Sequence, residues 1–107
     1  MSSTIDRMVM ERAIKLVESG WMQGSWAQDK NGARVDWDAK EAVAFCAVGA
    51  IMRATRELLG ADIHPFIWSY RRMSCLTSEE AADMMARNDV GTKEMTLEMM
   101  RENLATL

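Results

Sequence analysis

The chain has 107 residues, 49% of them hydrophobic and 27% charged, and its 13 basic and 16 acidic residues give a formal net charge of −3. This length and composition predict a single folded domain over residues 1–107 and exclude an intrinsically disordered chain. The acidic balance argues against nucleic-acid binding, which usually needs a basic stripe. The sequence shows neither a membrane-spanning apolar run nor a secretory signal, so we expect a cytoplasmic protein with reduced thiols.

The first predicted helix runs from Thr4 to Ser19 and ends at Gly20. Its apolar residues recur at the spacing that gives a helix one buried face: Met10, Ala13, Ile14 and Val17. We therefore expect a surface helix with a single stripe facing the core.

Residues 20–37 hold three of the four tryptophans in the chain: Trp21, Trp26 and Trp37. Glycines interrupt this stretch, and Asn31-Gly32 is a strong signal for a tight turn. We expect a Trp-rich loop or short hairpin, here called the Trp-rich segment, whose tryptophans lie across the helices as a lid.

A central apolar helix is predicted at about residues 39–59. Asp38 followed by Glu41 resembles an acidic capping box, and no charged residue occurs between Ala42 and Met52. A helix that is apolar on two sides is expected to be buried on both. Small residues such as Gly49 and Ala50 predict a close helix crossing there.

Three further helices are expected. Pro65 suits the start of one, Thr77-Ser78-Glu79-Glu80 forms a capping box for another that ends near Arg87, and Thr92 caps the last. The last helix has the core stripe Leu97, Met100, Leu104 and Leu107, with Met95 and Met99 beside it. The predicted fold is therefore mainly α, a compact bundle of about five helices around the helix at 39–59.

Cys46 and the single histidine, His64, are the sharpest candidates for chemistry. A nucleophilic thiol usually needs a helix N-terminus or a neighbouring cation. The predicted helix places Cys46 about two turns inside, between Phe45 and Ala47, which favours a role in core packing. His64 precedes Pro65 and is typical of an exposed turn residue.

The Trp-rich segment could also form an aromatic-walled ligand pocket, with Gln23 as a hydrogen-bonding residue. Asn88-Asp89 is either turn chemistry or a polar site. One histidine and two separated cysteines give no metal-ligand spacing, and no cofactor motif is present. We expect no metal, no cofactor and no catalytic residue. A candidate ligand or partner site comprises Trp21, Gln23, Trp26, Cys46, Asn88 and Asp89.

Several short motifs occur in order: Gly20-Trp21-Met22-Gln23-Gly24, Cys46-Ala47-Val48-Gly49-Ala50 and Asn88-Asp89. In this order they resemble a family of small proteins of unknown function from actinobacteria and bacteriophages. That family has Trp before its Asn-Asp turn, where this chain has Arg87. The resemblance implies a bacterial or phage origin and brings no activity with it.

The sequence best fits a non-enzymatic protein that binds another protein, such as a phage-encoded inhibitor or regulator of a host system. Methionines make adaptable binding surfaces, so Met95 and Met99 are the candidate interface, with either a different protein or a second copy as partner. The alternative is a small-molecule or nucleotide-binding domain, or a thiol-dependent enzyme. Its site would join the Trp-rich segment, Cys46 and Asn88-Asp89.

Overall fold

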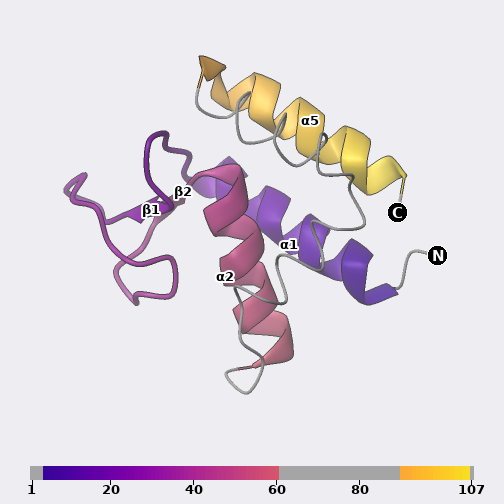
Figure 1. Ribbon diagram of the computed structural model, residues 1–107, viewed down its shortest axis with the longest axis horizontal. Coiled ribbons are helices and arrows are strands. Elements are labelled where there is room, and N and C mark those ends of the chain that lie inside the picture. The colour runs from indigo at the N-terminus through magenta and orange to yellow at the C-terminus, as the bar shows by residue number, and fades with distance from the viewer. Residues whose placement is uncertain (1–3, 61–89, 107) are drawn as a thin grey trace.

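The computed structural model describes residues 4–60 and 90–106 of the chain. Within these ranges the chain is mainly helical, with three helices and one small two-stranded sheet (Figure 1). The two helices expected after Pro65 and at Thr77 fall outside the described residues, as do His64 and the Asn88-Asp89 turn. The described part therefore supports the mainly α class without reaching the expected five helices.

Helix α1 spans Thr4–Ser19, which confirms the predicted bounds. Its buried side chains form the expected stripe: Val9, Met10, Ala13, Ile14 and Val17. This stripe packs against both α2 (Ala47–Leu59) and α5 (Lys93–Ala105), so α1 lies between them in Figure 1. The helix at the centre of the described fold is therefore α1, not the apolar helix near residues 39–59 as predicted.

Helix α2 begins at Ala47, eight residues later than predicted, and ends before Gly60 as expected. The residues before it form two turns and strand β2 (Ala44–Phe45). Strand β2 pairs antiparallel with β1 (Ala27–Gln28), and Ala27 lies opposite Phe45. The prediction failed because pairing with a distant strand competed with the local capping signal at Asp38.

The Trp-rich segment does contain a short hairpin. Gln28 and Arg34 form a bridge that closes a tight turn, and Gly32 sits within it at φ 83°. The Asp29 carboxylate accepts hydrogen bonds of 2.9 Å from the backbone nitrogens of both Asn31 and Ala33. The turn predicted from Asn31-Gly32 is thus confirmed, with Asp29 as the residue that fixes it.

Helix α5 begins after Thr92, whose hydroxyl accepts a hydrogen bond of 3.2 Å from the Met95 nitrogen. This confirms the predicted cap. Two bonds tie the helix to the end of α1: the Lys93 ammonium donates to the Glu18 carbonyl at 2.7 Å, and Arg101 pairs with the Glu18 carboxylate at 3.0 Å. None of the described helices has both the length and the apolar character to cross a membrane.

Candidate functional site

Cys46 is the N-cap residue of α2, so the prediction that it lies inside a helix is wrong. Its Sγ accepts a hydrogen bond from the Gly49 nitrogen at 3.3 Å, as a serine hydroxyl does at many helix starts. Its own nitrogen donates to the Trp26 carbonyl at 3.2 Å. The residue is only 7% exposed, so the thiol closes the helix end within the core.

Gly49 lies against the Trp-rich segment and not in a helix crossing. A Cβ atom at Gly49 would collide with the backbone carbonyl of Trp26. Gly20 is similar, because a Cβ there would collide with the carbonyl of Val43. Both glycines therefore allow backbone segments to touch, which is a correction to the expected role of Gly49.

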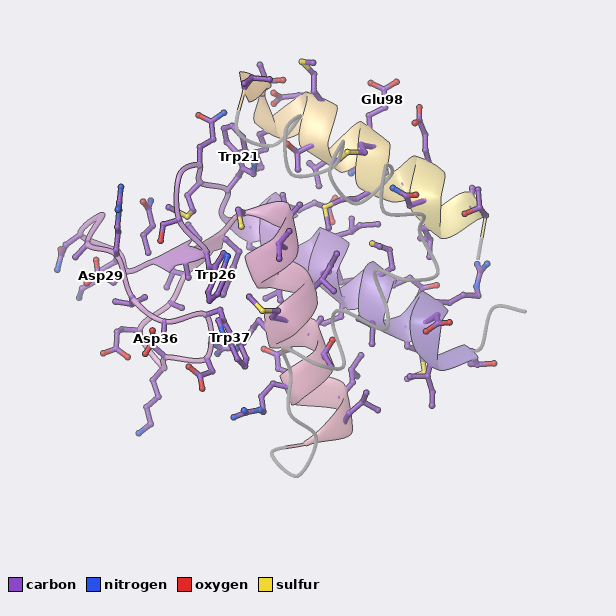
Figure 2. The ribbon with its side chains drawn as sticks, in the orientation of Figure 1. Trp21, Trp26, Asp29, Asp36, Trp37 and Glu98 are labelled. Carbon is purple, nitrogen blue, oxygen red and sulfur yellow. The ribbon has the colours of Figure 1, made fainter. Side chains whose placement is uncertain are left out.

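The three tryptophans have different environments and do not form one lid. The Arg56 guanidinium lies 5.3 Å from the centre of the Trp37 ring, and Arg53 donates to the Trp37 carbonyl at 3.2 Å. Trp21 is partly buried against the core. Trp26 is 45% exposed. In Figure 2, Trp26 and Trp37 lie on the sheet side of α2, whereas Trp21 lies toward the start of α5.

A pocket of about 380 Å³ opens beside Trp26; we call it the Trp26 pocket. The residues that line it come from both arms of the hairpin: Ser25, Trp26, Arg34, Val35 and Asp36. Neither Cys46 nor Gln23 lines it. Sequence reasoning identified Trp26 but missed Arg34 and Asp36, for which the only signal was their i, i+2 spacing beside a turn.

Gln23 has a connecting role. Its side-chain amide donates to the Gly91 carbonyl at 2.9 Å and so links the Trp-rich segment to the loop before α5. The other expected polar partners, Asn88 and Asp89, lie outside the described residues. That the tryptophans, Cys46 and Asn88-Asp89 form one site therefore remains a prediction.

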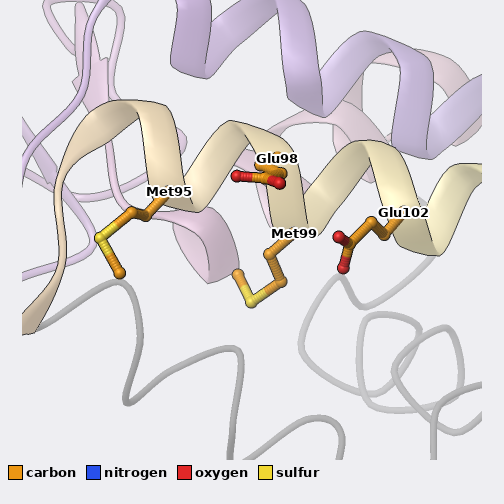
Figure 3. A pocket seen from close by; sticks show the side chains of 4 residues that line it. All are labelled: Met95, Glu98, Met99 and Glu102. Carbon is orange, nitrogen blue, oxygen red and sulfur yellow. The ribbon is translucent and has the colours of Figure 1, made fainter.

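A second, smaller pocket of about 190 Å³ lies on α5, and we call it the α5 groove (Figure 3). Met95, Glu98, Met99 and Glu102 line it. Met95 is 50% exposed, but Met99 is only 5% exposed and belongs to the core cluster. Of the two residues of the expected interface, Met95 is therefore open to solvent and Met99 is largely buried, and the interface itself stays a prediction.

Charged side chains join α1, α2 and the chain before β2. Glu57 pairs with Arg12 at 2.6 Å and with Arg53 at 3.1 Å. Partial burial raises the pKa of Glu57, but hydrogen bonds and attraction from the two arginines outweigh it, so this pKa lies below its usual value. The same hydrogen bond raises the pKa of Arg12. In the described ranges no cluster of His, Cys, Asp or Glu is arranged to hold a metal ion.

Comparison with known proteins assigns residues 1–89 to the model of a family of unknown function, DUF6197. The chain belongs to this family. Searches of curated proteins and of solved structures found no match. Cys46, Gly49 and the Trp26 pocket fall within the part matched by the DUF6197 model, whereas α5 and its groove follow it.

Proposed function

We propose that the chain is a small regulatory protein that binds another protein, and that the α5 groove receives a basic amphipathic segment of this partner. The observation that carries the proposal is the half-exposed Met95 at a groove whose other exposed lining residues are glutamates. The phage resemblance of the motifs favours a host regulatory system as the setting.

The size of the groove supports an anchoring side chain. Small-molecule sites usually have volumes of roughly 300–1,000 Å³. At about 190 Å³ the α5 groove is smaller. The flexible, half-exposed side chain of Met95 can adapt to an apolar side chain of a partner, as methionines do at many binding surfaces, while the buried Met99 lines the groove beside it.

Charge supports a basic partner. Glu94, Glu98 and Glu102 follow one another at i, i+4 spacing and so lie on one side of α5 beside Met95. None of the three forms an ion pair within the described residues. A cationic segment would gain attraction from all three, which mainly favours rapid and selective association.

The test is affinity capture from the native host with the full chain as bait, identification of captured proteins by mass spectrometry, and titration of the purified partner. Met95→Glu should weaken binding about tenfold, the usual loss when an apolar anchor is removed. Glu98→Lys should slow association, and the effect should shrink as salt rises.

Matched controls lie on α1. Met8 is 47% exposed, close to the 50% of Met95, and Glu11 is an exposed glutamate away from the groove. Met8→Glu and Glu11→Lys should leave binding unchanged. The proposal is wrong if Met95→Glu and Glu98→Lys bind as the wild type does. Sedimentation of the same variants tests a second copy as the partner, and self-association lost in Met95→Glu would replace the basic segment with a homodimer.

A further inference from the structure

The Trp26 pocket is independent of the α5 groove and is built on a fixed backbone frame. The Trp26 carbonyl accepts from the Cys46 nitrogen at 3.2 Å, and its backbone lies directly against Gly49. On the other arm, the Val35 nitrogen donates to the Ala27 carbonyl at 3.2 Å. The first bond ties Trp26 to the start of α2 and the second joins the two arms of the hairpin, so the backbone around the pocket is held in place.

Two opposite charges in this pocket have no partner among the residues that the structure describes. Neither Arg34 nor Asp36 forms a side-chain hydrogen bond or ion pair with any described residue, and they do not pair with each other. The neighbouring acids are engaged, because Asp29 fixes the turn and Asp38 pairs with Arg56 at 3.7 Å. Arg34 and Asp36 are two residues apart in the sequence, and both line the pocket.

The pocket therefore offers an exposed indole face, a guanidinium and a carboxylate in a volume of about 380 Å³, which lies in the usual range for small-ligand sites. An exposed indole stacks on a planar ring. A guanidinium binds phosphate through two parallel hydrogen bonds. A carboxylate accepts hydrogen bonds and needs a ligand edge that carries donors.

We propose that the Trp26 pocket binds a guanine nucleotide, with the base stacked on Trp26, its Watson–Crick edge on Asp36 and its phosphate on Arg34. Guanine has two adjacent donors on that edge, N1–H and the 2-amino group, which match the two oxygens of a carboxylate. Adenine and cytosine place a ring-nitrogen acceptor beside their amino group and would meet the carboxylate with a lone pair. The positive charge of Arg34 thus selects the phosphate, and the negative charge of Asp36 selects the base.

The test follows the tryptophan indole N–H signals of the full chain by NMR while GMP is added, with AMP, IMP and guanosine as comparisons. Trp26→Phe assigns the Trp26 signal. GMP should shift this signal in a saturable way and more than those of Trp21 and Trp37. AMP should bind at least about tenfold more weakly, because it lacks the paired donors. IMP lacks the 2-amino group, and guanosine lacks the phosphate, so each should fall between GMP and AMP.

Exposed positions supply the variants, so folding can be confirmed from the same spectra. Asp36→Asn should remove the preference for GMP over AMP, and Arg34→Gln should make GMP and guanosine bind equally. Trp26→Ala should weaken GMP roughly five- to 150-fold, the range that base stacking contributes. Glu41→Gln and Lys30→Gln change exposed charges that do not line the pocket, and both variants should bind GMP as the wild type does.

Three results would each overturn the inference: no saturable shift with GMP, equal binding of GMP and AMP by the wild type, or shifts centred on Trp21 or Trp37. Loss of GMP binding in the Glu41→Gln and Lys30→Gln controls would equally count against it. None of these results bears on the α5 groove, which is tested with a protein partner.

Discussion

Gly49 lies with its α carbon against the carbonyl group of Trp26, and no space remains between them for a side chain. The same carbonyl accepts a hydrogen bond from the Cys46 nitrogen. The first turn of α2 and the wall of the Trp26 pocket are therefore one unit. A substitution at Gly49 should therefore disturb both the first turn of α2 and the wall of the pocket.

Gly49→Ala should destabilise the fold by about 1–3 kcal/mol, because the added methyl group forces the helix and the Trp26 backbone apart. The sign is informative, since glycine to alanine in a helix normally stabilises by about 1 kcal/mol through helix propensity. Urea unfolding followed by circular dichroism measures the difference. An unfolding midpoint that rises would show that the contact with Trp26 is loose.

Cys46→Ala should destabilise the fold by about 0.5–2 kcal/mol, the usual loss when an N-cap acceptor is removed. Cys46→Ser should be less harmful, because the hydroxyl can also accept from the Gly49 nitrogen. Urea midpoints of the two variants decide the matter. If the alanine variant is the more stable of the two, the thiol acts only by filling space, since a buried hydroxyl without a partner is unfavourable.

Alkylation provides a second measurement on Cys46. A helix N-terminus favours thiolate, but a thiol that is 7% exposed is poorly accessible to reagent. Native labelling should therefore be far slower than labelling after denaturation, with peptide mapping to separate Cys46 from Cys75. Rapid native labelling at neutral pH would support the thiol-dependent alternative.

Local sequence signals predicted α1 and α5 well. Each has an apolar stripe at helical spacing, α1 ends at Gly20, and α5 starts with a capping threonine. The start of α2 could not be read in this way. Asp38 and Glu41 imitate a capping box, yet strand pairing between Ala44–Phe45 and Ala27–Gln28 overrides it, and Asp38 pairs with Arg56 instead.

The candidate site shows the same division between local and distant information. Trp26 could be singled out as a candidate because it lies in the Trp-rich segment, although the sequence did not distinguish it from Trp21. Arg34 and Asp36 could not, because backbone pairing between the two arms, at Gln28–Arg34 and Ala27–Val35, returns the chain to Trp26. Arg53 likewise holds the loop through the carbonyls of Trp37 and Ala39, contacts that no spacing in the sequence reveals.

Met95 and Met99 form a matched pair on one helix with opposite expected behaviour. Met99→Ala should cost about 2–5 kcal/mol, as truncation of buried methionine usually does, because Met99 is 5% exposed. Met95→Ala should change stability by less than about 0.5 kcal/mol, since Met95 is 50% exposed. Thermal or urea unfolding measures both. Equal losses would show that Met95 is also part of the core.

Glu57 gives a pH-dependent test of the contact between α1 and α2. Its pKa is lowered in the folded protein, so its contribution to stability is present above the pKa of the unfolded chain and is lost as pH falls through the folded-state value. Glu57→Gln should cost about 0.5–1 kcal/mol at pH 7, the upper range for partly exposed ion pairs. The difference from wild type should close as pH falls toward roughly 3.

Urea unfolding at a series of pH values measures this difference, with Glu11→Gln as the control. Glu11 lies on α1 close in sequence to Arg12, but it has no ion pair within the described residues and an exposed side chain. Its variant should follow the wild type at every pH. A stability gap for Glu57→Gln that stays constant from pH 7 to pH 3 would mean that Glu57 acts through its shape and not through its charge on Arg12 and Arg53.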